Sequence, residues 1–197
     1  MNGSMPPLDQ NIALILLAAG RSERFGADKL TAPFRGKPLW EWAAGSAEKA
    51  GFAHLYLIVG DHSKIRSRHN WQTVVNPAAA SGMGTSIAAG VAAAASHRRI
   101  VIALADMPMV DPDHLRLMAA GSGPVFTRQA DGTAGSPAAF DDDSFNALRS
   151  LGGDRGARSL SFPDAKIIEP GEEALVIDID TPSELARYVG LNVRRHI

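Results

Sequence analysis

Two groups of residues in the chain have types and spacings that suit the chemistry of a phosphorylated ligand. The first is LLAAGRSERFGADKL, residues 16–30, in which an apolar run meets Gly20 and is followed by Arg24 and Lys29. Small residues let a ligand approach the backbone closely, and arginine and lysine bind phosphate groups. The segment therefore suits a polyphosphate. A solvated basic turn, with Arg21 as a third cation, is the alternative.

The second group consists of aspartates in or after apolar runs. Asp106 follows six apolar residues, and Asp178 and Asp180 alternate within a later run. A carboxylate at the end of a buried strand is costly unless it is paired, hydrogen-bonded or bound to a metal, although Asp106 could instead cap the next turn. Alternate strand residues point to opposite faces, so we expect only one of the later pair to face a site. Two oxygen ligands without nearby histidine or cysteine suit Mg²⁺.

Several common site patterns are missing from the sequence. The loop from Gly20 to Gly26 lacks the Gly-Lys-Ser/Thr of a P-loop, and Gly82-Met83-Gly84 continues to Ile87, where a dinucleotide fingerprint needs glycine. The chain has no cysteine, and its six histidines show no metal-ligand spacing. These observations count against P-loop ATPases, NAD-dependent oxidoreductases and thiolate chemistry.

Length and composition indicate one domain. The chain has 197 residues, 45% of them hydrophobic, and a formal net charge of −1, which argues against general binding of nucleic acid or membrane surfaces. No apolar run approaches the ~20 residues of a membrane span, and residues 1–10 do not resemble a signal peptide. We expect a flexible N-terminus over 1–10, one domain over 11–197 and a cytoplasmic location.

The elements that must position these residues alternate between strands and helices. This alternation predicts the α/β class, as a single-domain three-layer sandwich around a mostly parallel, Rossmann-like sheet, with some antiparallel pairing within 124–170. Ligands of such sheets gather beyond the carboxyl ends of the strands. The expected strands are 12–17, 54–60, 72–77, 100–106, 124–128, 137–140, 166–169 and 175–180. The expected helices are 38–50, 82–99, 111–121, 142–153, 154–162 and 181–190.

A family resemblance covers nearly the whole chain. LLAAGRSERFGADKL resembles the L-A-A-G-x-S-x-R-x-G-x-x-K signature of nucleotidyltransferases with the molybdenum cofactor guanylyl/cytidylyltransferase-like fold. Five later segments are similar to that family's motifs and occur in the same order: TAPFRGKPLWEWA, NPAAASGMGTSIAAG, LADMPMV, GDRGAR and DIDTPSEL. The resemblance extends from about residue 12 to 190 and implies the nucleotide-diphospho-sugar transferase type of sheet.

The resemblance also implies roles for particular residues. The transfer would be Mg²⁺-dependent, and electrostatics and alignment carry such in-line phosphoryl chemistry. The implied nucleotide-binding residues are Leu17, Ala18, Ala19, Gly20, Arg24, Lys29, Gly82 and Thr85. The implied catalytic residues are Arg24, Lys29 and Asp106, and the implied metal ligands are Asp106 and Asp180, with Asp178 as the alternative to Asp180.

The implied substrates are an NTP and a small phosphorylated acceptor. Ala19 resembles the cytidylyltransferase branch, which favours CTP and molybdopterin-type cofactor as acceptor, with a molybdoenzyme or its chaperone as protein partner. Ser136 stands where cytidylyl members carry histidine, and Asp28 stands where they carry proline, so base and acceptor stay open. A sugar phosphate acceptor and a non-catalytic nucleotide- or cofactor-binding module are the alternatives.

Overall fold

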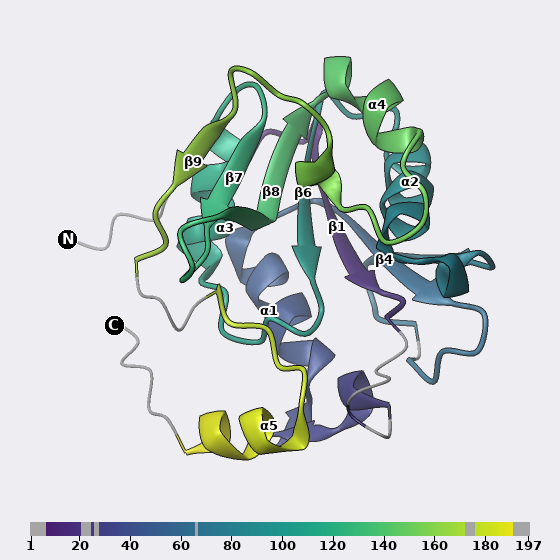
Figure 1. The fold of residues 1–197 in the computed structure, drawn as a ribbon, viewed down its shortest axis with the longest axis vertical. Helices are drawn as coiled ribbons and strands as arrows, with labels where there is room; N and C mark the ends of the chain where they lie inside the picture. The colour runs from purple at the N-terminus through teal and green to yellow at the C-terminus, as the bar shows by residue number, and fades with distance from the viewer. Residues whose placement is uncertain (1–6, 21–24, 26–27, 66, 172–175, 191–197) are drawn as a thin grey trace.

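A seven-stranded sheet forms the centre of the computed structural model, which describes residues 7–20, 25, 28–65, 67–171 and 176–190 (Figure 1). The strands in order across the sheet are β5 (Trp71–Asn76), β4 (His54–Gly60), β1 (Ile12–Ala18), β6 (Arg99–Leu104), β8 (Ala134–Asp141), β7 (Val125–Arg128) and β9 (Lys166–Ile168). A separate two-stranded sheet pairs β2 (Pro33–Phe34) with β3 (Lys37–Pro38).

Most neighbouring strands of the large sheet are parallel. β4 pairs in parallel with β5 and β1, β1 with β6, and β7 with β9, whereas β8 runs antiparallel to both β6 and β7. β1 is buried along its whole length, as its uninterrupted apolar sequence requires for a central strand. The α/β class, the mostly parallel sheet and the antiparallel pairing within 124–170 are thereby confirmed.

Helices cover both faces of this sheet and give three layers (Figure 1). β1 shows the division: Leu14 and Leu16 join one hydrophobic core, and Ile15 joins the other. The first core includes residues of α1 and α3, and the second includes residues of α2 and α4. The α-helices are α1 (Trp40–Ala50), α2 (Met83–Ala93), α3 (Pro112–Ala120), α4 (Phe145–Arg149) and α5 (Pro182–Val189). The 3₁₀ helices are η2 (Lys29–Thr31), η3 (Ala79–Ser81), η4 (Asp142–Ser144) and η5 (Ala157–Ser159).

Four expected elements differ from the structure, among them the helix predicted over 142–153, which consists of η4 and α4 and ends at Arg149. The described part of the predicted strand 175–180 pairs with no strand of the described chain; its apolar residues Val176 and Ile179 are buried in the first core instead. Packing rather than strand pairing therefore explains that alternating pattern. The helix predicted over 82–99 ends at Ala93, and only η5 forms within 154–162.

The last helix, α5, is attached to the two-stranded sheet of β2 and β3, near the end of β1. The guanidinium of Arg35, between β2 and β3, donates hydrogen bonds of 2.7 and 3.2 Å to the carbonyl oxygen of Tyr188. Figure 1 shows α5 beside this region, beyond the end of the sheet at which β1 and β6 finish. In the part of the chain that the structure describes, no helix is long and apolar enough to cross a membrane.

Candidate active site

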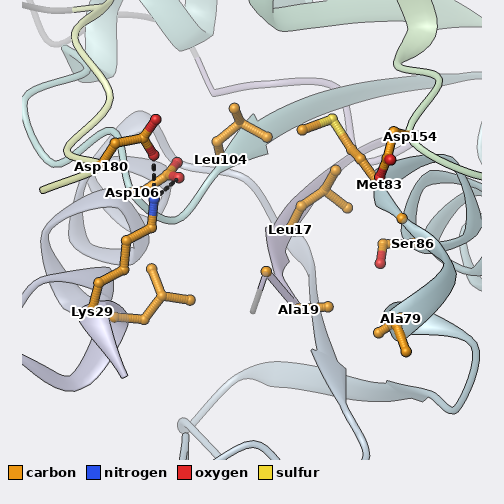
Figure 2. Close-up of a pocket in the computed structure, with 14 residues that line it drawn as sticks. Leu17, Ala19, Lys29, Ala79, Met83, Ser86, Leu104, Asp106, Asp154 and Asp180 are labelled. Carbon is orange, nitrogen blue, oxygen red and sulfur yellow. Dashed lines mark hydrogen bonds and ion pairs between the residues drawn. The ribbon is translucent and has the colours of Figure 1, made fainter. Parts of the chain in front are cut away.

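Three side chains that lie far apart in the sequence meet beyond the carboxyl ends of β1 and β6. The ammonium group of Lys29 lies 2.8 Å from Asp106 Oδ2 and 2.8 Å from Asp180 Oδ1 (Figure 2). The Lys29 side chain is only 9% exposed, against 21% for Asp106 and 27% for Asp180. This group, hereafter the acid–lysine cluster, brings together the predicted phosphate-binding cation and both predicted metal ligands.

The end of β6 positions Asp106. The strand finishes at Leu104, and the backbone N–H of Ala105 donates a 3.0 Å hydrogen bond to the carbonyl oxygen of Leu17 on β1. Asp106 therefore follows immediately after the last residue fixed by the sheet. Its Oδ2 accepts from Lys29, while its Oδ1 is buried with no hydrogen-bond partner among the described residues. A buried oxygen that lacks a donor is a position where a cation is favourable.

The start of α5 positions Asp180. Thr181 and Glu184 form a capping box, the arrangement that the sequence Thr-Pro-Ser-Glu favours at a helix N-terminus. The Glu184 carboxylate also accepts a 2.9 Å hydrogen bond from the backbone N–H of Asp180. One residue earlier, the N–H of Ile179 donates a 3.0 Å hydrogen bond to the carbonyl oxygen of Asp106. The two aspartates are thus joined through the backbone as well as through Lys29.

The cluster stabilises its own cation. Burial alone would lower the pKa of Lys29, but the charge of Asp106 and the hydrogen bonds to both aspartates outweigh it, so the pKa is raised. Lys29 is therefore a cation at neutral pH. The charged form of Asp178 is disfavoured instead, because desolvation and repulsion from Asp106 and Asp180 raise the pKa of its carboxyl group.

The cluster forms one end of a cavity of about 430 Å³. Its walls come from the ends of β1 and β6, from η2, η3 and the start of α2, and from the loop after α4. The lining residues are Leu17, Ala19, Gly20, Lys29, Leu30, Ala79, Ala80, Gly82, Met83, Ser86, Leu104, Asp106, Asp154 and Asp180. Figure 2 shows the acid–lysine cluster on one side, Leu17 and Leu104 in the middle, and Met83, Ser86 and Asp154 on the other side.

Backbone conformation does not explain why the residue at position 20, which lines this cavity, is a glycine. A Cβ atom added there would meet no atom of the described residues within 4 Å, and the residue's φ is not in the left-handed region. The described part of the chain therefore does not require glycine at this position. The space that a side chain would fill belongs to the cavity, as expected for a backbone that a ligand approaches closely.

A buried amide organises the opposite wall. Asn76, the last residue of β5, donates hydrogen bonds of 2.9 Å to Thr85 Oγ1 and 3.0 Å to Ser86 Oγ. Thr85 Oγ1 also lies within hydrogen-bonding distance of the carbonyl oxygens of Gly82 and Ala78, at 2.8 and 2.9 Å. Thr85 therefore holds the turn before α2 in shape, and its neighbour Ser86 is the one that lines the cavity.

The structure brings most of the predicted site residues to one cavity. The predicted residues that line it are Leu17, Ala19, Gly20, Lys29, Gly82, Asp106 and Asp180. Ala18 is buried in the first core and, like Thr85, is not a lining residue. Arg24 and Arg21 lie outside the described residues. The roles given to all these residues in nucleotide binding and catalysis stay predictions.

Sequence reasoning missed several lining residues. Ser86 and Asp154 belong to segments that carry the family resemblance, GMGTSIAAG and GDRGAR, yet neither received a role. The signal for Asp154 was its position after two consecutive glycines, which allow close packing of backbones. The other lining residues without a predicted role are Leu30, Ala79, Ala80, Met83 and Leu104.

The donor set suits a hard divalent cation that keeps part of its hydration shell. Among the described residues, no group of three or more histidine, cysteine, aspartate or glutamate side chains could hold a metal ion by itself. A metal at the cluster would therefore have the oxygens of Asp106 and Asp180 as protein ligands and complete its shell with water and phosphate oxygens, as Mg²⁺ does. The buried, unpartnered Oδ1 of Asp106 fits this role.

Two sequence comparisons relate the chain to known proteins. The sequence profile of the MobA-like NTP transferase domain matches residues 14–167. The purine catabolism protein PucB of Bacillus subtilis is 29% identical over 188 residues, which cover 86% of this chain and 92% of PucB.

Solved structures share the fold over nearly their whole length. Rv0371c of Mycobacterium tuberculosis H37Rv has a TM-score of 0.75 at 26% identity, with 90% of this chain and 97% of that one covered. A further structure of Rv0371c, a complex with manganese, gives a TM-score of 0.68 at 24% identity over the same shares. Molybdopterin-guanine dinucleotide biosynthesis protein A of Archaeoglobus fulgidus has a TM-score of 0.63 at 18% identity, covering 89% of this chain and 95% of that one, and shows the common fold alone.

Proposed function

The chain belongs to the MobA-like NTP transferase domain family, and on this basis we propose that it transfers CMP from CTP to the phosphate of a molybdopterin-type cofactor. Nucleotidyl transfer from an NTP is the activity of the family. The choice of CTP and of this acceptor is the finer part of the proposal, which rests on Ala19 and on the ordered motifs.

The observation that carries the proposal is the acid–lysine cluster at one end of the cavity. Lys29 provides a buried cation, and Asp106 and Asp180 provide carboxylates 2.8 Å from it. A triphosphate bound there would meet Lys29 directly, since the cluster and Gly20 line the same cavity. Cations held in a partly buried site stabilise the charge that develops during phosphoryl transfer.

The reaction needs only alignment and charge neutralisation from the protein. An oxygen of the acceptor phosphate attacks the α-phosphorus, the bond from that phosphorus to the bridging oxygen breaks, and pyrophosphate leaves. Lys29 would neutralise the triphosphate and the leaving pyrophosphate, and the small residues Ala19 and Gly20 would let the phosphates lie against the backbone. Asp106 and Asp180 would hold a divalent cation, Mg²⁺, which supplies further charge neutralisation when bound. The manganese complex of Rv0371c is consistent with a divalent cation in this family.

A panel of acceptors tests this proposal. The chain is mixed with Mg²⁺, each NTP in turn and either molybdopterin or a set of sugar phosphates, and pyrophosphate release is followed. We expect release with CTP and molybdopterin, and a loss of at least about a hundredfold in Asp106→Ala. Pyrophosphate release with a sugar phosphate but not with molybdopterin would identify the sugar phosphate as the acceptor. If the wild type shows no turnover and Asp106→Ala still supports the function of a partner protein, the chain is a non-catalytic binding module.

A further inference from the structure

Two loops that lie about seventy residues apart in the sequence interlock at the start of α2. The backbone N–H of Gly84 donates a 2.9 Å hydrogen bond to the carbonyl oxygen of Gly153. A Cβ atom on Gly82 would lie 2.3 Å from the backbone carbon of Gly153 and 2.4 Å from Asp154 Oδ1. One on Gly84 would lie 2.8 Å from the carbonyl oxygen of Arg155. Gly82, which precedes α2, and Gly84, in its first turn, are therefore both necessary for the second loop to lie directly on the first.

This interlock places the carboxylate of Asp154 on the cavity wall. Asp154 lines the cavity beside Met83 and Ser86, on the side away from the acid–lysine cluster (Figure 2). Within the described chain, its carboxylate has no hydrogen bond or ion pair. The second loop thus adds one acceptor group to a wall that is otherwise mostly apolar.

The order of groups along an NTP matches the order of groups along the cavity. The phosphates suit the end that holds Lys29, and the apolar middle is lined by Leu17 and Leu104. In this orientation the base would reach the wall formed by Met83 and Asp154, where the thioether offers an adaptable apolar surface. An ionised carboxylate accepts hydrogen bonds and cannot donate them. Cytosine, adenine and guanine each carry an exocyclic amino group that can donate to such a carboxylate, and uracil carries none.

We propose that Asp154 accepts a hydrogen bond from the exocyclic amino group of the bound base and so selects CTP, GTP or ATP against UTP. Uracil has a carbonyl oxygen where cytosine has its amino group, and that oxygen would face the Asp154 carboxylate without a proton between them. The inference rests on the proposed nucleotide-binding function and adds to it the residue that reads the base. It assigns a role to the GDRGAR segment that the acid–lysine cluster does not explain.

Equilibrium binding of the four NTPs, measured by calorimetry with Mg²⁺, tests this inference without knowledge of the acceptor. We expect the wild type to bind at least one amino-bearing NTP about tenfold or more tightly than UTP. In Asp154→Asn, whose amide can donate to a carbonyl oxygen, this ratio should fall to within about threefold. Asp154→Ala should lose the preference without gaining affinity for UTP. Asp164→Asn, the same change at an exposed residue outside the cavity lining, should keep the wild-type ratio.

The outcomes separate the inference from the function on which it rests. If no NTP binds the wild type, the proposed nucleotidyltransferase function itself fails. If NTPs bind but UTP binds as well as the others, or if the ratio is the same in Asp154→Asn and the wild type, Asp154 does not read the base. Thermal unfolding of each variant should match the wild type, which keeps the comparison free of misfolding.

Discussion

The ammonium group of Lys29 lies 2.8 Å from Asp106 Oδ2, although the two residues are 77 positions apart. The cation expected to meet the triphosphate is therefore held by the carboxylate expected to meet the metal. Asp180 shares the same cation at 2.8 Å. We expect these ion pairs to exchange partners when a metal–nucleotide complex binds. Lys29 would then contact the phosphates, and the two carboxylates would contact the metal.

Replacement of Lys29 with methionine tests this exchange. In metal-free buffer, the free energy of unfolding of Lys29→Met should be about 1–3 kcal/mol lower than that of the wild type, because two carboxylates lose a buried cation. This is below the cost for fully buried pairs, since Asp106 and Asp180 are 21% and 27% exposed. Millimolar Mg²⁺ should then raise the melting temperature of the variant more than that of the wild type, because no ammonium competes for the carboxylates.

Lys64→Met is the matched control, since Lys64 is exposed and lies outside the cavity lining. Its response to Mg²⁺ in the same thermal scan should equal that of the wild type. An equal response of Lys29→Met and the wild type to Mg²⁺ would contradict the exchange of partners.

A methyl group at Gly20 should affect binding and leave the fold intact. A Cβ there would touch none of the described residues within 4 Å, so the free energy of unfolding of Gly20→Ala should stay within about 0.5 kcal/mol of the wild type. The methyl group would occupy space that the phosphates need, so we expect Gly20→Ala to bind NTP about tenfold more weakly. This corresponds to a loss of about 1.4 kcal/mol of binding free energy. Calorimetric titration with Mg²⁺ and CTP measures this; unchanged affinity would mean that the ligand does not pass close to Gly20.

Gly82 should show the reverse pattern. It has a φ of +115°, and an added Cβ would lie 2.3 Å from the backbone of Gly153. Gly82→Ala should therefore lower the free energy of unfolding by at least about 2 kcal/mol. Gly152 lies in the facing loop, and no described residue would come within 4 Å of a Cβ atom there, so Gly152→Ala should change the free energy of unfolding by less than about 0.5 kcal/mol. Equal effects of the two substitutions in urea denaturation would rule out the interlock of the loops.

The buried His114 predicts a pH dependence that is separate from the active site. Burial lowers the pKa of His114, with the charge of Asp111 opposing it only in part, and its Nε2 lies 2.8 Å from Thr127 Oγ1. The unfolded chain therefore takes up a proton at a higher pH than the folded chain. The stability that the neutral imidazole contributes is present above its unfolded pKa of about 6.5 and is lost as pH falls through the lowered folded pKa.

Urea denaturation of the wild type and His114→Gln between about pH 8 and pH 5 isolates this contribution. The free energy of unfolding of the wild type should fall more steeply with decreasing pH than that of His114→Gln, so the difference between the two should shrink on the acidic side. Parallel pH profiles would show that His114 does not titrate differently in the folded and unfolded chains.

The sequence was sufficient for the parts of the site that depend on strand order. Buried strands with parallel neighbours have continuous apolar sequences, so β1 and β6 were recognisable. Asp106 comes two residues after the end of β6, and Lys29 belongs to the loop segment that follows β1. Parallel strands place such residues at one edge of the sheet. The convergence of Lys29, Asp106 and Asp180 on one cavity follows from this order, together with the capping signature that begins α5.

Other features depend on tertiary contacts that spacing does not encode. Asp178 and Asp180 alternate like strand residues, yet the structure uses no strand there, and the hydrogen bond from Ile179 to Asp106 orients the segment. A threonine hydroxyl can contact a ligand, but that of Thr85 is hydrogen-bonded to carbonyl oxygens of the turn before α2. The position of Asp154 beside Gly82 arises only when the loop after α4 packs on the start of α2.

The fate of each phosphate of CTP tests the central claim most directly. CTP labelled at the α- or the γ-phosphate is incubated with the wild type, Mg²⁺ and the acceptor that supports pyrophosphate release, and the products are separated. We predict that the α-label appears in the acceptor product and the γ-label in pyrophosphate, in equal amounts, and that Asp106→Asn forms both at least about a hundredfold more slowly. Transfer of the γ-label to the acceptor, its release as inorganic phosphate, or full activity of Asp106→Asn would contradict nucleotidyl transfer at this site.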